Sequence, residues 1–127
     1  MSYKTYEVRI YDNGDKKWWL NGKLHREDGP ATEWTDGTKI WYLNGKRHRE
    51  DGPAYEDSDG TKEWYLNGKL HREDGPAVEW SNGSKEWWIN GERLTEDEWM
   101  RQASPVKEMT VAEISKKLGY EVKVVKE

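Results

Sequence analysis

Hydrophobic side chains recur along this chain with a fixed spacing of 23 residues. The clearest markers are four tryptophans, each followed by a second aromatic residue and an aliphatic one: Trp18-Trp19-Leu20, Trp41-Tyr42-Leu43, Trp64-Tyr65-Leu66 and Trp87-Trp88-Ile89. Alternate side chains of a strand point to opposite faces of a sheet. The pattern therefore predicts strands in which the first tryptophan and the aliphatic residue share one face. The middle aromatic residues form a row on the other face, namely Trp19, Tyr42, Tyr65 and Trp88.

Each repeat also carries a turn signal between two runs of strand-forming residues. In the last copy, residues 77–80 and 85–89 flank Asn82-Gly83. Such a dipeptide predicts a β-hairpin with a type I′ turn, because its residues tolerate positive φ angles. The equivalent dipeptides are Asn13-Gly14, Asp36-Gly37 and Asp59-Gly60. Each repeat is therefore predicted to supply one hairpin of two strands, which places equivalent residues of successive repeats about 10 Å apart.

The segment between the hairpins is nearly identical each time it occurs. Residues 21–31 and 67–77 both read NGKLHREDGPA, and residues 44–54 read NGKRHREDGPA. Its Gly-Pro pair favours a turn over a central strand. We interpret these three segments as joints that carry the chain from one hairpin to the next.

The two ends of the chain depart from the repeat. Residues 3–11 (YKTYEVRIY) predict an N-terminal strand that begins the sheet. After the last hairpin, Thr95 and Glu98 form a capping box, in which each side chain is placed to bond the backbone amide of the other residue. This capping box predicts a helix over residues 96–103.

The remaining C-terminal residues predict a second helix and a strand. Thr110 and Glu113 form another capping box, and residues 121–126 (EVKVVK) alternate as a strand. We therefore expect a single, mainly β domain. Its parts are an elongated antiparallel sheet of stacked hairpins over residues 1–94 and a small α/β cap over residues 95–127.

Composition favours a thin sheet over a thick globule. Hydrophobic residues make up 33% of the chain and charged residues 36%, yet the chain contains 9 Trp and 7 Tyr, whose polar tips suit half-buried positions. The formal net charge of −4 argues against binding to double-stranded DNA, whose phosphates attract basic surfaces. There is no Cys, and no apolar run reaches the roughly 20 residues that span a bilayer. We expect a cytoplasmic protein that does not span a membrane.

The repeat WYLNGKxHREDGPAxEWxDGxK resembles the MORN repeat family, and more closely its variants in phage, bacterial and giant-virus proteins. The resemblance extends over about residues 7–93. It implies stacked β-hairpins, and membrane-binding or scaffolding roles are ascribed to the family. Ordinary MORN units carry His-Gly-x-Gly after the first glycine, whereas here the histidine is followed by Arg-Glu-Asp-Gly-Pro. The phage-type resemblance implies a phage-encoded protein that acts in the cytoplasm of its host.

The charged residues of the joints are the candidate chemical groups. Histidines about 10 Å apart cannot share one metal ion, whose nitrogen ligands lie at about 2.0–2.1 Å, so each histidine is expected to hydrogen-bond its joint. Two roles remain open for the arginines: bidentate pairs with carboxylates that bridge adjacent joints, or a grip on a phosphate-bearing ligand whose base stacks on aromatic rings. The expected ligand-binding residues are His25, Arg26, His48, Arg49, His71, Arg72, Trp19, Tyr42, Tyr65 and Trp88.

The chain is not expected to be an enzyme. Acid–base catalysis needs unlike groups in a closed pocket, whereas this chain presents the same groups repeatedly along an open sheet, so no catalytic residue, metal or cofactor is predicted. We expect a binding protein that sequesters or inhibits a host defence component, either a small nucleotide ligand or a host protein. The alternative is a structural or scaffolding module of protein-interaction or lipid-headgroup-binding type. Residues 3–11 would also offer a sheet edge for pairing into a homodimer.

Overall fold

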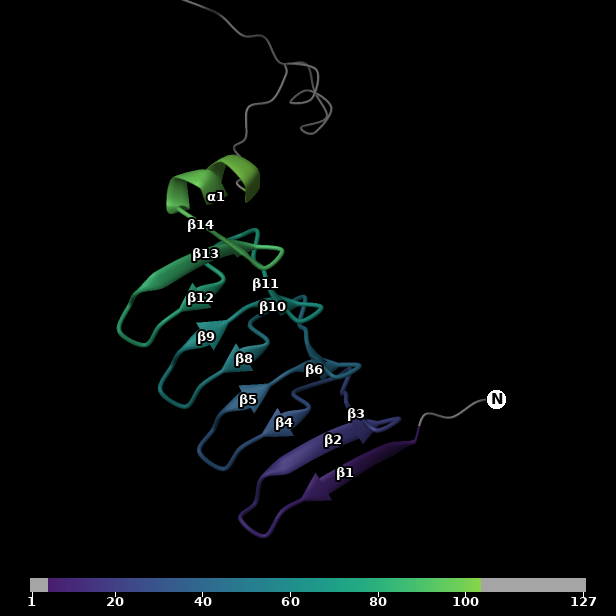
Figure 1. Ribbon diagram of the computed structural model, residues 1–127. Coiled ribbons are helices and arrows are strands. Elements are labelled where there is room, and N and C mark those ends of the chain that lie inside the picture. The colour runs from purple at the N-terminus through teal and green to yellow at the C-terminus, as the bar shows by residue number, and fades with distance from the viewer. Residues whose placement is uncertain (1–4, 104–127) are drawn as a thin grey trace, which may run out of the picture.

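The computed structural model describes residues 5–103, which form a ladder of short antiparallel strands with a helix at its far end (Figure 1). The strands of the first half are β1 (Tyr6–Ile10), β2 (Lys16–Leu20), β3 (Lys23–Leu24), β4 (Thr32–Glu33), β5 (Lys39–Ile40), β6 (Tyr42–Leu43) and β7 (Lys46–Arg47). Those of the second half are β8 (Tyr55–Glu56), β9 (Lys62–Glu63), β10 (Tyr65–Leu66), β11 (Lys69–Leu70), β12 (Val78–Glu79), β13 (Lys85–Ile89) and β14 (Glu92–Leu94), followed by α1 (Glu96–Ala103). The predicted mainly β fold of stacked hairpins is confirmed.

The main sheet adds its strands in the order β1-β2-β4-β5-β8-β9-β12-β13-β14. Successive hairpins therefore lie side by side, as Figure 1 shows. Within each repeat one extended segment makes two pairings. The segment that holds β5 and β6 is interrupted at Trp41, whose amide donates to the Ala54 carbonyl at 2.7 Å. Strand β5 pairs with β4 and β8 in the main sheet, and β6 forms a separate hairpin with β7.

This second hairpin occupies the Asn-Gly part of each joint, which the sequence interpretation treats only as a connection. The same pairing joins β2 to β3, β10 to β11 and β13 to β14. Its turn has positive φ at both central residues, as in Asn44 (51°) and Gly45 (79°). These are the type I′ turns of the molecule.

The prediction of type I′ turns at the other hairpin ends is wrong. At Asn13-Gly14 only the glycine has a positive φ, of 96°. The Gly14 amide donates to the Tyr11 carbonyl (2.8 Å) and the Tyr11 amide donates to the Asp15 carbonyl (2.9 Å). This is a type I turn followed by a glycine bulge, which leaves one more residue in the loop than a type I′ hairpin does.

The ends of the described region agree with the sequence interpretation. Strand β1 lies at one end of the main sheet, within the predicted N-terminal strand. Helix α1 covers the predicted residues and begins with the expected capping box: the Glu98 amide donates to Thr95 Oγ1 (3.1 Å), and the Thr95 amide donates to Glu98 Oε1 (3.2 Å). The predicted second helix after Thr110 and the predicted strand over residues 121–126 lie outside the described residues.

The core of the sheet is thin, as expected from its composition. The buried hydrophobic residues of the described region are Ala31, Ile40, Ala54, Ala77, Val78 and Leu94. In residues 5–103, no second layer of helices covers the sheet: α1 packs at its end against β13 and β14 (Figure 1), and Trp99 Nε1 of this helix donates to the Arg72 carbonyl at 2.8 Å. Most aromatic side chains are therefore half-buried and available on one of two faces.

Candidate functional site

Each joint closes around its own arginine. In the middle joint, Arg49 Nε donates to Asp51 Oδ1 and Arg49 Nη1 donates to the Pro53 carbonyl, both at 3.0 Å. The guanidinium lies over Trp41, 4.0 Å from the ring centroid. The Arg49 side chain is 24% exposed, whereas the Asp51 side chain is 87% exposed. The arginine therefore ties the two ends of the loop together and covers one face of the tryptophan ring.

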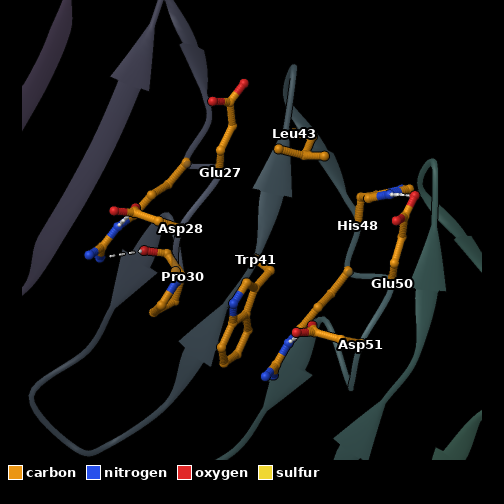
Figure 2. A pocket seen from close by; sticks show the side chains of 11 residues that line it. Glu27, Asp28, Pro30, Trp41, Leu43, His48, Glu50 and Asp51 are labelled. Carbon is orange, nitrogen blue, oxygen red and sulfur yellow. Dashed lines mark hydrogen bonds and ion pairs between the residues drawn. The ribbon is translucent and has the colours of Figure 1, made fainter.

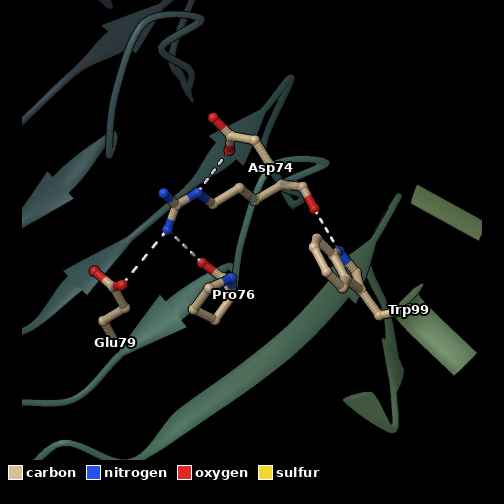
Figure 3. Close-up of polar contacts among 5 residues, drawn as sticks. Asp74, Pro76, Glu79 and Trp99 are labelled. Atoms are coloured by element: carbon tan, nitrogen blue, oxygen red, sulfur yellow. Dashed lines mark hydrogen bonds and ion pairs between the residues drawn. The ribbon is translucent and has the colours of Figure 1, made fainter. Parts of the chain in front are cut away.

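The other two joints repeat this geometry. The distances to the carboxylate, the carbonyl and the ring centroid are 2.9, 3.2 and 3.9 Å for Arg26 with Asp28, Pro30 and Trp18. They are 2.8, 3.0 and 3.8 Å for Arg72 with Asp74, Pro76 and Trp64. Figure 3 shows Asp74, Pro76 and Glu79 around the guanidinium of the last joint. The expected bidentate bridge between adjacent joints is thus replaced by contacts of each arginine with its own joint and with the residues that flank it.

The glycine of the Asp-Gly-Pro sequence allows the close approach of this arginine. A Cβ atom on Gly52 would lie 2.9 Å from Arg49 Cζ, and one on Gly75 would lie 2.7 Å from Arg72 Cζ. Both distances are shorter than non-bonded carbon atoms tolerate. A side chain at this position would therefore force the guanidinium to shift away from the loop that it now lies against.

Each histidine links its joint to the next repeat. His48 Nδ1 accepts a hydrogen bond from the Asn67 amide at 2.9 Å, and the equivalent pairs are His25 with Asn44 (2.9 Å) and His71 with Asn90 (3.0 Å). A nitrogen that accepts an N–H carries no proton, so the proton of the neutral ring is on Nε2. His48 Nε2 lies 3.6 Å from Glu50 Oε1. The histidines therefore hold neighbouring repeats in register.

Two similar grooves lie between successive joints. The first, of about 680 Å³, is lined by Trp41, Leu43 and His48 between the loops at residues 26–30 and 49–51. Figure 2 shows Trp41 between Pro30 of one loop and Asp51 of the next. The second groove, of about 600 Å³, has Trp64, Leu66 and His71 in the same places. We call the side of the sheet with the joints and grooves the joint face.

The opposite side, which we call the open face, carries its own aromatic residues. Cross-strand register pairs Val8 with Trp18 and Glu7 with Trp19, so these tryptophans point to opposite faces. The open face holds the row Trp19, Tyr42, Tyr65 and Trp88, flanked near the hairpin turns by Tyr11, Trp34 and Trp80. Arg9 lies over Trp19, and Lys17 lies over Trp34, each cation 5.3 Å from the ring centroid.

The middle of the open face contains the one residue that differs among the joints. Arg47 stands where the other joints have leucine, and its guanidinium lies 5.1 Å from the Tyr55 centroid and 5.3 Å from the Tyr65 centroid. Arg47 Nη1 donates to the Tyr65 hydroxyl (3.3 Å), which donates to Glu63 Oε1 (2.6 Å). Burial, followed by this bond to Glu63, raises the pKa of Tyr65 to about 12.

A further row of polar contacts was not predicted. Asp15 Oδ1 accepts from the Thr35 amide (2.9 Å), and this hydrogen bond lowers the pKa of the Asp15 carboxyl. Two repeats further on, Thr61 Oγ1 accepts from the Ser81 amide at 3.2 Å. The side chains at this position thus link successive hairpin turns. The sequence does contain a signal for these contacts, because a small polar residue follows each turn glycine with the same spacing of 23 residues.

The ten predicted ligand-binding residues do not form one site. The histidines and arginines lie on the joint face, where the tryptophans beneath the guanidiniums are Trp18, Trp41 and Trp64. The predicted aromatic residues form the row on the open face, on the other side of the sheet. Among residues 5–103, no group of three or more His, Cys, Asp or Glu side chains is arranged to hold a metal ion.

Comparisons with protein-family models, curated proteins and solved structures found no match to this chain. The described part of the chain contains no helix with the length and apolar character that a membrane crossing requires.

Proposed function

We propose that this chain is a non-enzymatic binding protein that holds a protein partner against its open face. The observation that carries the proposal is the aromatic row that recurs on this face in every repeat. Of the flanking residues, Tyr11, Trp34 and Trp80 are 40, 39 and 44% exposed. Tyr, Trp and Arg provide most of the binding energy at protein interfaces, and the open face combines all three.

The geometry favours a protein over a small nucleotide. The joint arginines, for which a grip on phosphate was one of two open roles, are each engaged by a carboxylate, a carbonyl and a tryptophan, as Arg49 is. A base held between two rings needs them about 7–8 Å apart, which is two contact distances. The rings of the aromatic row repeat at about 10 Å, twice the strand spacing. A broad protein surface suits this array better than a single base does.

The absence of enzymatic activity is supported by how the joint side chains are used. The histidine nitrogen that would act as a general base, His48 Nδ1, already accepts a backbone hydrogen bond within the fold. The resemblance of the repeats to phage-type variants supports a particular kind of partner. The partner is a host component, and the bound protein inhibits it by occupying its surface.

The test compares two variants of the immobilised protein. In Trp34→Ser/Trp80→Ser, two exposed rings of the open face are removed, whereas Glu50→Gln changes a residue of the joint face. The wild-type protein and Glu50→Gln are expected to retain the same partner from extracts of the host cell. Loss of two interface tryptophans at about 2 kcal/mol or more each should weaken the purified complex at least about 700-fold.

Two results would overturn the proposal. One is a double variant that keeps its fold, shown by an unchanged melting transition, and still binds the partner with wild-type affinity. The other is a melting shift with a panel of nucleotides and cyclic dinucleotides, of the size expected for a ligand at 100 times its dissociation constant, about 2.7 kcal/mol. That shift would show that the chain binds a nucleotide.

A further inference from the structure

We propose that the two grooves of the joint face bind a basic peptide segment in the polyproline II conformation, with Lys or Arg at every third position. This site is separate from the open face and does not depend on the proposed function. It rests on three properties of the grooves: an aromatic and proline lining, an acidic rim, and a repeat distance.

The lining matches the way proteins hold extended, proline-rich chains. Segments in polyproline II conformation dock into aromatic-lined grooves, and they lose little entropy because the free chain already adopts this conformation. Trp41 lies in the first groove beside Leu43, and Pro30 forms part of one wall. Trp64, Leu66 and Pro53 occupy the same places in the second groove. The two grooves thus form a pair of equivalent subsites.

The rim of the grooves selects a basic occupant. Each groove is lined by two arginines and four carboxylates, which gives a formal charge of −2 with neutral histidine. The cations are turned inward, since the Arg49 side chain is 24% exposed and its charge lies over Trp41. The carboxylates are turned outward, and Glu50, which lines both grooves, has a side chain 85% exposed. The surface that an incoming chain meets is therefore acidic.

The repeat distance selects the conformation of the occupant. Each repeat adds two strands to the main sheet, which separates the grooves by about 9.6 Å. Three residues of a polyproline II helix make one turn and rise about 9.3 Å, so every third side chain meets an equivalent groove. In a β-strand, side chains on one face repeat at about 6.8 Å.

A lysine or arginine at every third position fits both the apolar lining and the acidic rim of a groove. Its hydrocarbon stem packs along Trp41 and Leu43, and its charged end reaches the carboxylates of the rim, such as Glu50 and Asp51. The two intervening residues of each turn face away from Glu50 and are free to be proline. The occupant is thus a segment with the repeated pattern Pro-Pro-Lys that lies across successive joints.

Synthetic peptides test the periodicity. The probe is a capped peptide of four Pro-Pro-Lys units, titrated into the full chain at low salt by calorimetry. The control peptide has the same composition with its lysines in one block. We expect the periodic peptide to bind about 10-fold more tightly than the block peptide, and both affinities to fall as salt is raised. Equal affinities, or no binding by the periodic peptide, would overturn the proposal.

Charge-neutral variants test the location. In Glu27→Gln/Glu50→Gln/Glu73→Gln, one carboxylate of each joint is replaced without changing its shape, and Glu92→Gln makes the same change outside the grooves. Each lost surface ion pair should weaken binding about 2- to 5-fold, so the triple variant should bind at least about 10-fold less tightly. Glu92→Gln and Trp34→Ser/Trp80→Ser should bind the peptide as the wild type does. Unchanged binding by a folded triple variant would refute the site.

Discussion

Replacement of Arg49 by alanine is the most direct test of how the joints hold the fold together. Arg49→Ala removes a guanidinium that lies 4.0 Å from the Trp41 centroid, which contributes about 1 kcal/mol at a partly buried site. It also removes the hydrogen bond to the Pro53 carbonyl, worth about 1.5 kcal/mol for a charged donor. The bond to Asp51 adds about 0.5 kcal/mol or less, because this carboxylate is 87% exposed.

The expected loss is therefore about 3 kcal/mol of the free energy of unfolding. For a domain of this size the melting temperature should fall by about 10 °C. Chemical denaturation followed by tryptophan fluorescence measures the change, and calorimetry provides the melting temperature. Because each repeat is stabilised by its neighbours, a weakened middle joint should also broaden the unfolding transition.

The matched control is Arg93→Ala. The Arg93 side chain is 63% exposed and lies 3.8 Å from Glu86, so its loss should change the free energy of unfolding by no more than about 0.5 kcal/mol. Arg49→Lys should recover only part of the loss, since an ammonium cannot stack on Trp41 while bonding both Asp51 and Pro53. The structural role is refuted if Arg49→Ala unfolds as the wild type does and instead loses binding of a phosphate-bearing ligand.

Two further predictions concern His48 and Tyr65. In denaturant unfolding, His48→Asn should be more stable than His48→Gln by about 1 kcal/mol. The asparagine Oδ1 takes the place of Nδ1 and still accepts from the Asn67 amide, whereas glutamine places its oxygen further out. Equal stabilities of the two variants would contradict this role of His48. The raised pKa of Tyr65, about 12, means that the folded state holds its proton longer than the unfolded state, whose tyrosines titrate near about 10. The resulting stability is present below about pH 10 and is lost as the pH rises towards about 12. Tyr65→Phe should reduce this alkaline loss, measured by unfolding at several pH values together with phenolate absorbance. An unchanged pH profile would count against the combined effect of Tyr65 burial and its hydrogen bond to Glu63.

Much of the fold follows from the order of residues along the chain. The 23-residue spacing of Trp18 and its equivalents predicts the stacked hairpins, because a repeated unit must bury its apolar face against its neighbours. The capping box of Thr95 and Glu98 predicts the start of α1, since both partners lie within one helical turn. These predictions succeed because the interactions behind them are local or repeat with the sequence.

The choice between the two turn types was not available from the dipeptides alone. Asn-Gly occurs both in the type I′ turn at Asn44-Gly45 and in the bulged type I turn at Asn13-Gly14. The number of residues between the paired strands decides the type, and this number depends on the register between strands. Register is set by cross-strand contacts, such as those that pair β4 with β5.

The sequence by itself determined a linear series of hairpins, a joint after each of the first three repeats, and the alternation of aromatic side chains across the sheet. Only the tertiary structure decided what each joint residue contacts: His48 reaches Asn67, 19 residues further along, while Arg49 turns back onto Trp41. It also placed Arg26, Arg49 and Arg72 on the face opposite the open-face aromatic row and left the joint carboxylates turned outward. The physical reason is that spacing defines which residues are equivalent, whereas the partner of a side chain depends on which atoms the packing of neighbouring repeats brings within bonding distance.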